Sequence, residues 1–338
     1  MKLKSYKITR FSLKERGYHQ GGGTNNTNEC PSFSKKRMGT GDLKRKTMLG
    51  HYLAGLIEGD GSIIVPKTIR NQKGKLLYPK VKITFVDKDA PLAEKIKELI
   101  GAGTIERPSN TKYLNLLFQD VKSLQAIAVL LNGKMRTPKI EALYRLIDWL
   151  NARSPSSQLT KLGLDTSPLG NNPWLSGFIE SDGNFYSSFS INSKGIAEVL
   201  RHYMRISQKS LYSQNLDISK ENNSKCSASQ IMEKIREFLD VKSINKIVRT
   251  RDNYVETSYE VRTSKKSSSE KLINYLNEYP LFSSKHQDFL DWVEIHKIRL
   301  SKAHKTIEGT SKLVFLKNSM NTLRTQFNWD SLTRFYTG

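Results

Sequence analysis

Apolar and polar positions follow two different periods along the chain, and together they predict a mixed α and β fold. Leu53, Leu56 and Ile57 repeat at helical spacing, and Gly61 stands where such a helix would end. Alternating residues then predict a hairpin, with strands at 62–69 and 78–86 and a turn at 71–74. The remaining elements of this region are a helix at 91–100, strands at 103–107 and 112–118, and helices at 121–131 and 138–151.

The first predicted helix belongs to a segment that occurs twice. Residues 53–63 return 122 residues later as residues 175–185, with six of eleven positions identical. A second echo aligns Asp87 with Gln208 at an offset of 121, and a third pairs residues 137–139 with 283–285 at the start of a later helix. Three echoes in the same order indicate a duplicated domain. We therefore expect an α+β protein of two pseudo-symmetric αββαββα halves, each with an antiparallel sheet.

Composition divides the chain into four segments. Residues 1–46 carry twelve Lys and Arg against three acids, without a sustained apolar period, and are interpreted as a flexible basic arm. The first half follows at 47–153, and residues 154–172 are rich in Ser, Pro, Gly and Asn, as linkers are. The second half at 173–338 contains an inserted polar loop at about 211–229 before a helix at 230–239. It ends with an amphipathic helix at 306–324, anchored by Phe327 and Trp329.

The charge of the chain limits the classes of partner that it can bind. Its net charge is +23, from 55 Lys and Arg against 32 acids, which attracts a polyanion. A membrane is excluded as partner because no run of eighteen apolar residues occurs. Nucleic acid remains. Cys30 and Cys226 stand alone, without metal-binding spacing, which fits a reducing compartment. The acid-poor arm also fits an organellar import sequence, so we expect an organelle, the mitochondrion before the chloroplast.

The repeated segment places an acid where a helix disfavours one. Asp60 and Asp182 follow the ends of the two repeated helices, where the macrodipole costs a carboxylate about 0.3–1 kcal/mol. Gly55 with Gly59, and Gly177 with Ser181, would let the two helices pack closely and bring the acids together. Adjacent carboxylates repel unless divalent cations lie between them, and their hard oxygen atoms favour Mg²⁺ or Mn²⁺. One acidic turn is commonly just a helix stop, but duplication favours a metal site.

The paired segments resemble the doubled signature of the LAGLIDADG endonuclease family, over roughly residues 50–325. The resemblance implies a single-chain homing endonuclease in which Asp60 and Asp182 bind the catalytic metals. Glu58 and Glu180 would pack within the helix interface. Lys139 and Lys285 match the basic residues that the family places near the scissile phosphates, although both also fit ordinary lysines at helix starts. Gln208 matches a residue that orders active-site water, and its aligned counterpart Asp87 departs from the family pattern.

The same resemblance implies that each antiparallel sheet enters the major groove of DNA, which admits a β-ribbon. Alternation assigns the side chains that would face DNA. In the first half these are Ile64, Pro66, Thr68, Arg70, Lys80, Lys82 and Thr84; in the second they are Tyr186, Ser188, Ser190, Asn192, Arg201, Tyr203 and Arg205. Two sheets end to end predict a double-stranded target of about 20 base pairs. Because the two sets differ, the target should be asymmetric and the protein a monomer.

Two other functions fit the same fold. Relatives encoded in introns also act as maturases, which bind intron RNA and assist splicing, and the basic arm would suit that role. A DNA-binding regulator on a retired nuclease scaffold is less favoured, because both Asp60 and Asp182 are present. The two acids favour the nuclease, either alone or combined with maturase activity.

Overall fold

The computed structural model describes residues 40–153, 158–210, 227–251 and 254–336. Most of the expected basic arm therefore lies outside the described residues, while its last part, residues 40–46, belongs to the first helix. The expected polar insertion lies outside them up to residue 226. The helix after it begins at Ser229, within the range assigned to the insertion.

The first half contains four helices and a sheet of four strands in the described residues. Gly101, at a φ of 68°, ends one helix in the left-handed conformation that glycine adopts without strain. The Asp120 side chain accepts a hydrogen bond from the Ser123 amide at the start of another. The elements are α1 (Thr40–Gly59), β1 (Gly61–Ile64), β2 (Lys80–Val86), η1 (Asp87–Asp89), α2 (Ala90–Ile100), β3 (Thr104–Glu106), β4 (Tyr113–Phe118), α3 (Val121–Leu131) and α4 (Ile140–Asn151).

The second half repeats this order and adds elements at its end. No helix in the described parts of the chain is long and apolar enough to cross a membrane. The elements are η2 (Leu169–Asn171), α5 (Trp174–Asp182), β5 (Gly183–Ile191), β6 (Ala197–Lys209), α6 (Ser229–Phe238), β7 (Asn245–Arg251), β8 (Tyr254–Arg262), α7 (Lys266–Glu278), α8 (Lys285–Leu300), η4 (Ala303–Lys305), α9 (Ile307–Asn318), η5 (Asn321–Leu323) and η6 (Asp330–Arg334).

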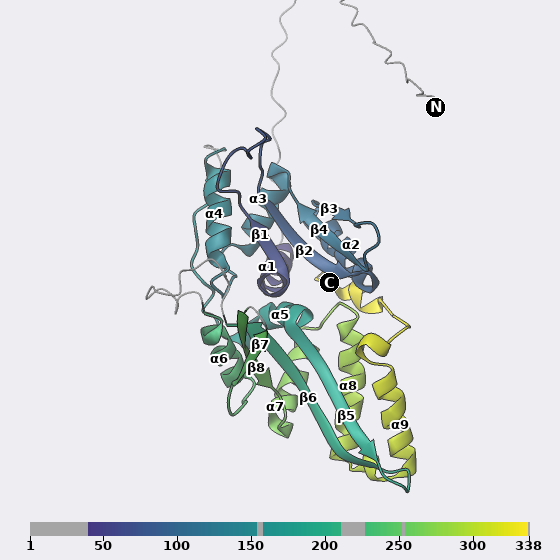
Figure 1. Ribbon diagram of the computed structural model, residues 1–338. Helices are drawn as coiled ribbons and strands as arrows, with labels where there is room; N and C mark the ends of the chain where they lie inside the picture. Colours follow the sequence, from purple (N-terminus) through teal and green to yellow (C-terminus); the bar gives the residue numbers. More distant parts are fainter. Residues whose placement is uncertain (1–39, 154–157, 211–226, 252–253, 337–338) are drawn as a thin grey trace, which may run out of the picture. The chain divides into compact units, whose positions relative to one another are not determined.

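The two halves are built alike and meet along α1 and α5, which lie side by side (Figure 1). The antiparallel sheets have the orders β1-β2-β4-β3 and β5-β6-β8-β7. In β2, Val81 and Ile83 are fully buried, while the alternate residues Lys80 and Lys82 lie on the other face. The duplicated α+β architecture expected from the sequence is confirmed.

The first strand is shorter than predicted. β1 ends at Ile64, so Pro66 and Thr68 lie outside it, and Arg70 forms only an isolated bridge with Leu76. Proline has no backbone N–H to donate to a ladder, which accounts for the early end. The predicted turn at 71–74 is confirmed, because the Gly74 amide donates to the Asn71 carbonyl at 3.0 Å.

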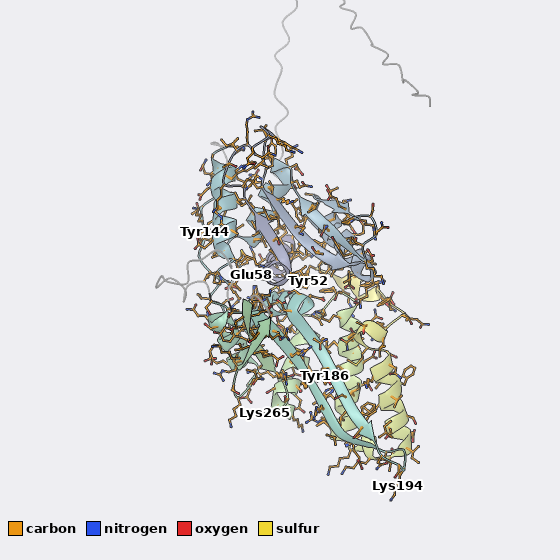
Figure 2. All side chains as sticks on the ribbon, viewed as in Figure 1. Tyr52, Glu58, Tyr144, Tyr186, Lys194 and Lys265 are labelled. Carbon is orange, nitrogen blue, oxygen red and sulfur yellow. The ribbon has the colours of Figure 1, made fainter. Side chains whose placement is uncertain are left out.

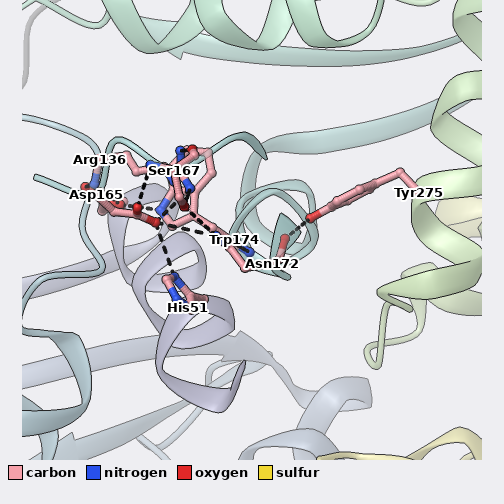
Figure 3. Close-up of polar contacts among 8 residues, drawn as sticks. His51, Arg136, Asp165, Ser167, Asn172, Trp174 and Tyr275 are labelled. Atoms are coloured by element: carbon pink, nitrogen blue, oxygen red, sulfur yellow. Dashed lines mark hydrogen bonds and ion pairs between the residues drawn. The ribbon is translucent and has the colours of Figure 1, made fainter. Parts of the chain in front are cut away.

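The linker is fixed along the first half in its described part, residues 158–172. The Asp165 carboxylate lies 2.7 Å from Arg136 Nη2 and 3.4 Å from His51 Nδ1 on α1 (Figure 3). Burial opposes ionisation of Asp165, but hydrogen bonds from His51 and Ser167 and the charge of Arg136 hold its pKa well below the usual range. At the far end, Tyr275 of α7 donates a hydrogen bond to the Asn172 carbonyl at 3.0 Å. The segment therefore joins both halves through specific polar contacts.

The C-terminal segment is anchored by other residues than predicted. The expected helix at 306–324 divides into α9 and η5, and Phe327 and Trp329 are only partly buried. Phe335 is fully buried instead, with its ring 5.4 Å from that of Tyr52 and 4.6 Å from that of Phe282. This end of the chain therefore packs against α1 close to the start of α8.

Candidate active site

The site begins with the close approach of α1 and α5. A Cβ on Gly55 would lie 1.9 Å from the Trp174 carbonyl oxygen, and one on Gly177 would lie 1.9 Å from that of Tyr52. Gly59 is similarly close to the Ser181 side chain. Only small residues permit this backbone contact, so the small-residue packing predicted from the sequence is confirmed.

The packing brings the two acidic helix ends together. A Cβ on Gly59 would lie 2.7 Å from Asp182 Oδ2, so the carboxylate at the end of α5 touches the last residue of α1. Desolvation and then the charge of Asp60 raise the pKa of Asp182 to about 7. Desolvation also raises the pKa of Asp60. The ionised forms of both carboxylates are therefore disfavoured, and a bound cation would stabilise them.

Two buried glutamates connect the helices to the segments that follow them. Glu58 accepts hydrogen bonds from the Arg136 and Thr137 amides and, at 2.6 Å, from Trp174 Nε1 on α5. Its pKa is raised to about 7 by burial, despite these donors. Figure 2 shows Glu58 close to Tyr52 at the helix junction. The packing role expected for this position is confirmed.

Glu180 repeats the arrangement in the other half. It accepts from the Ser283 amide at 3.0 Å and, across the helix pair, from the Tyr52 hydroxyl at 3.2 Å. Tyr52 and Trp174 each precede the repeated segment by one residue. That shared position is the sequence signal by which this pair of cross-helix donors could have been found.

Each predicted lysine caps one of the two helices. Lys139 Nζ lies 2.8–3.2 Å from the carbonyl oxygens of Ile57, Glu58, Gly59 and Gly61. Lys285 Nζ does the same at Ile179, Glu180, Ser181 and Gly183, at 2.6–3.4 Å. Burial lowers the pKa of both lysines, and the negative charges of Glu58 and Glu180, and then of the two aspartates, oppose that shift. The cations satisfy carbonyl groups that a helix end leaves free, and they offset the local charge of Asp60 and Asp182.

Gln208 contacts Asp182 directly. Its Nε2 donates to Asp182 Oδ2 at 2.5 Å, which helps to lower the pKa of that carboxylate. Gln208 therefore lies at the site, as predicted, at the end of β6.

The predicted pairing of Gln208 with Asp87 is wrong. Gly61 pairs with Ile83 in the first sheet and Gly183 with Ile206 in the second, so the counterpart of Gln208 is Phe85. Phe85 is 6% exposed, and its ring provides no hydrogen-bond donor for Asp60. Asp87 lies at the start of η1, half-exposed and 3.6 Å from Arg107. The two halves of the site therefore differ at this position, one holding an amide and the other an apolar ring.

A cleft lined by both halves has Asp60 in its wall. Its walls include Asp60, Thr84 and Lys88 from the first half and Asn184 and Lys285 from the second. In the described residues no three His, Cys, Asp or Glu side chains gather as a complete metal cluster. The two aspartates fit divalent ions as hard oxygen ligands whose mutual repulsion a cation would relieve. Water and a ligand in the cleft would have to complete the coordination.

Most of the residues predicted to face DNA lie on the outward face of their sheet, as expected. Lys80, Lys82 and Thr84 alternate with buried residues on β2, and Ile64 is 42% exposed on β1. On the second sheet the ring of Tyr186, labelled in Figure 2, stacks on that of Tyr203. The register places Ser188, Arg201 and Arg205 on the same outward face.

The tip of the second sheet differs from the prediction. Asn192 lies beyond β5, where its side chain accepts from the amides of Lys194 and Ile196 and so closes a turn. Ser190 pairs with Glu198 across a bulge that follows Ser188. An extra residue in the opposite strand bends it and changes where side chains point, which simple alternation does not foresee.

Further outward residues lie on strands for which we assigned none. Asn115 of β4 and Arg249, Glu260 and Arg262 of the β7–β8 hairpin are register partners of outward positions. The alternation in the strand predicted at 112–118, and in its counterpart, would have identified them.

Comparisons with known proteins agree with this geometry. The LAGLIDADG endonuclease family profile matches residues 53–150 and 175–296. The intron-encoded DNA endonuclease aI3 of Saccharomyces cerevisiae is 32% identical over 308 residues, which cover 85% of this chain and 73% of the yeast protein. A cox1 intron-2 protein of Schizosaccharomyces pombe is 27% identical, over 79% of this chain and 71% of that protein.

Solved structures show the same fold. The meganuclease I-SmaMI bound to uncleavable DNA aligns with a TM-score of 0.58 and 21% identity, over 82% of this chain and 98% of that one. The homing endonuclease I-LtrWI bound to target DNA aligns with a TM-score of 0.57 and 20% identity, over 83% and 100%. The profile covers both repeats, and the yeast relative covers most of the chain. The chain therefore belongs to the LAGLIDADG endonuclease family.

Proposed function

We propose that this endonuclease cuts both strands of a long, asymmetric DNA target, with divalent metal held by Asp60 and Asp182. The observation that carries the proposal is the meeting of these two carboxylates at the ends of the packed helices α1 and α5, beside a cleft lined by both halves. The family generally uses divalent metals, and one I-SmaMI structure holds uncleaved DNA in the presence of calcium ions. We propose Mg²⁺, or Mn²⁺, as the ion that supports cleavage.

The residues of the site have distinct parts in hydrolysis. A divalent ion would lower the pKa of water and offset charge on a phosphate. Gln208 fixes the orientation of Asp182 through the 2.5 Å hydrogen bond. Lys139 and Lys285 keep the helix ends in place. In the proposed complex their positive charges would stabilise negative charge that develops on the scissile phosphates. Phe85 leaves Asp60 without an equivalent amide, so we expect the two strands to be cut at different rates.

The sheet faces would read the DNA. Outward residues of both sheets would lie in successive major grooves, which gives a target of about 20 base pairs. The two faces differ at almost every outward position, which suits a non-palindromic target and a monomer. The cox1 intron origin of one relative supports an organellar location, with the mitochondrion favoured.

Cleavage of a plasmid that carries the intron-free insertion site tests the proposal. We expect linear product with Mg²⁺ and none with Ca²⁺, and we expect Asp60→Asn and Asp182→Asn each to abolish double-strand cutting. Asp87→Asn is the matched control, because Asp87 pairs with Arg107 and should leave cutting unchanged. Tight binding of the intron RNA together with no cutting of the plasmid would replace this function with that of a maturase.

A further inference from the structure

Two arginines face each other on the outward side of the second sheet. Arg205 of β6 and Arg262 of β8 are direct register partners, and their side chains are 42% and 38% exposed. Like charges directly opposite each other destabilise a sheet. The pair therefore needs a neighbouring group that offsets the repulsion between the two cations.

The neighbour is Glu260, a carboxylate only 1% exposed although it lies on the outward face. It forms a close ion pair with Arg262 Nε and lies 3.9 Å from Arg205 Nη1. The Ser207 hydroxyl donates to the same carboxylate at 3.3 Å. One buried acid between two cations holds the Arg262 guanidinium, attracts that of Arg205, and leaves a net positive charge above the sheet.

An aromatic platform orients one of the arginines. The guanidinium carbon of Arg262 lies 5.0 Å from the ring centre of Tyr203, which stacks on Tyr186 at 4.8 Å. In the described part of the chain, Arg205 and Arg262 donate no further hydrogen bond to a protein acceptor. Their remaining N–H groups are therefore available on the outward side, with Arg262 oriented by Glu260 and Tyr203.

The equivalent positions of the first sheet lack the second cation and the buried acid. The registers place Lys82 opposite Leu117 where the second half has Arg205 opposite Arg262. Asn115, hydrogen-bonded to Thr84 at 2.9 Å, stands where Glu260 stands beside Ser207. The acid thus occurs in the half with two cations, and a neutral amide occurs in the half with one.

We propose that Arg205 and Arg262 form a guanine-reading pair and that Glu260 is the positioning residue that presets them. This inference rests on the proposed DNA function. Arginine offers only donors, and its fork matches the O6 and N7 acceptors of guanine in the major groove. Arg205 lies three residues before Gln208, which contacts Asp182. The pair therefore reads G·C base pairs at the inner end of the second half-site, next to the cleaved centre.

The test compares base preferences of the full-length protein and its variants. A DNA library randomised across the target is selected by cleavage with Mg²⁺, and binding of single-base variants of the recovered site is measured with Ca²⁺. We expect the wild type to prefer guanine at one or two inner positions on the Asp182 side, by about tenfold or more. The double substitution Arg262→Leu with Glu260→Asn copies the first half, and it should remove that preference alone.

Two variants separate recognition from folding. Arg262→Lys keeps the charge but loses the planar fork, so it should fold normally and still weaken the preference. Arg201→Leu, on the same strand, should leave the inner guanine preference intact. A recovered site without inner guanines, or an unchanged profile in Arg262→Lys and the double variant, overturns the inference while cleavage itself stands. Failure to select any DNA would instead overturn the proposed function and this inference together.

Discussion

A hydrogen bond between the halves can be removed from either side, and removing both partners together should cost less than removing one. Asp89 of the first half is 9% exposed, and its Oδ1 accepts the Ser284 amide of the second half at 2.8 Å. Ser284 precedes α8, which begins with the helix-capping Lys285. The equivalent residue in the first half is Pro138, which has no N–H and needs no acceptor. Asp89 therefore serves a donor that only the second half possesses.

The magnitude follows from burial. Asp89→Ala leaves the buried Ser284 amide without its acceptor, which should lower the free energy of unfolding by about 1–3 kcal/mol. Ser284→Pro leaves the buried carboxylate without its donor and should cost a similar amount. The double substitution leaves neither group alone and should recover most of the loss, a coupling of about 1–2 kcal/mol. Ser284 has a φ of −52°, which proline accepts.

Urea unfolding of the four proteins, followed by tryptophan fluorescence at constant pH, measures the coupling. Asp89→Asn is the matched control, since its amide oxygen still accepts the Ser284 N–H and its stability should stay close to that of the wild type. If the double variant loses the sum of the two single losses, the hydrogen bond does not carry the stabilisation, and the reasoning from buried polar groups fails here.

Three further outcomes are expected. Gly177→Ala forces a Cβ against the Tyr52 carbonyl and should lower the free energy of unfolding in urea by about 1–3 kcal/mol or more. Gly41→Ala, on the open N-terminal turn of α1, should cause no such loss. Equal losses in the two variants would contradict the packing argument. Because the folded-state pKa of Asp182 is raised from 3.8 to about 7, the metal-free wild type should lose stability as the pH rises through that range. Asp182→Asn should lose less, with Glu58 still titrating there; parallel pH profiles would refute the contribution of Asp182. Lys285→Met leaves the carbonyls at the end of α5 without their donor and should lower the free energy of unfolding by about 1–3 kcal/mol; an unchanged melting curve would show that water replaces the ammonium group.

The sequence identified the duplicated helices, their close packing and the sheet faces because each depends on local period or residue size. It failed at Phe85 for a physical reason. Alternation has a period of two, so the alignment of Asp87 with Gln208, which is displaced by two residues from the true register, keeps the inward and outward assignments of β2 and of its counterpart β6 correct. The error of two residues becomes visible only from the backbone pairing of Gly61 with Ile83 and of Gly183 with Ile206.

Other features depended on contacts across the fold. Pro66 ends a strand that the apolar pattern alone continues, and the extra residue of β6 opposite the tip of β5 leaves no signal in composition. The four carbonyls around each of Lys139 and Lys285 likewise become visible only when helices distant in sequence meet.

The linker has a consequence for the energetics of target choice. Asp165 and its partners fasten the described part of this segment along the first half, and Tyr275 of the second half holds its end. If these contacts keep the two halves in one arrangement, most of the structural adjustment on binding would occur in the DNA. Bending and narrowing a duplex costs energy that depends on its base steps. The central base pairs, which would lie between the two sheets without contacting either, would then be selected for how easily they deform. The protein would discriminate targets by DNA deformability as well as by direct contacts with bases.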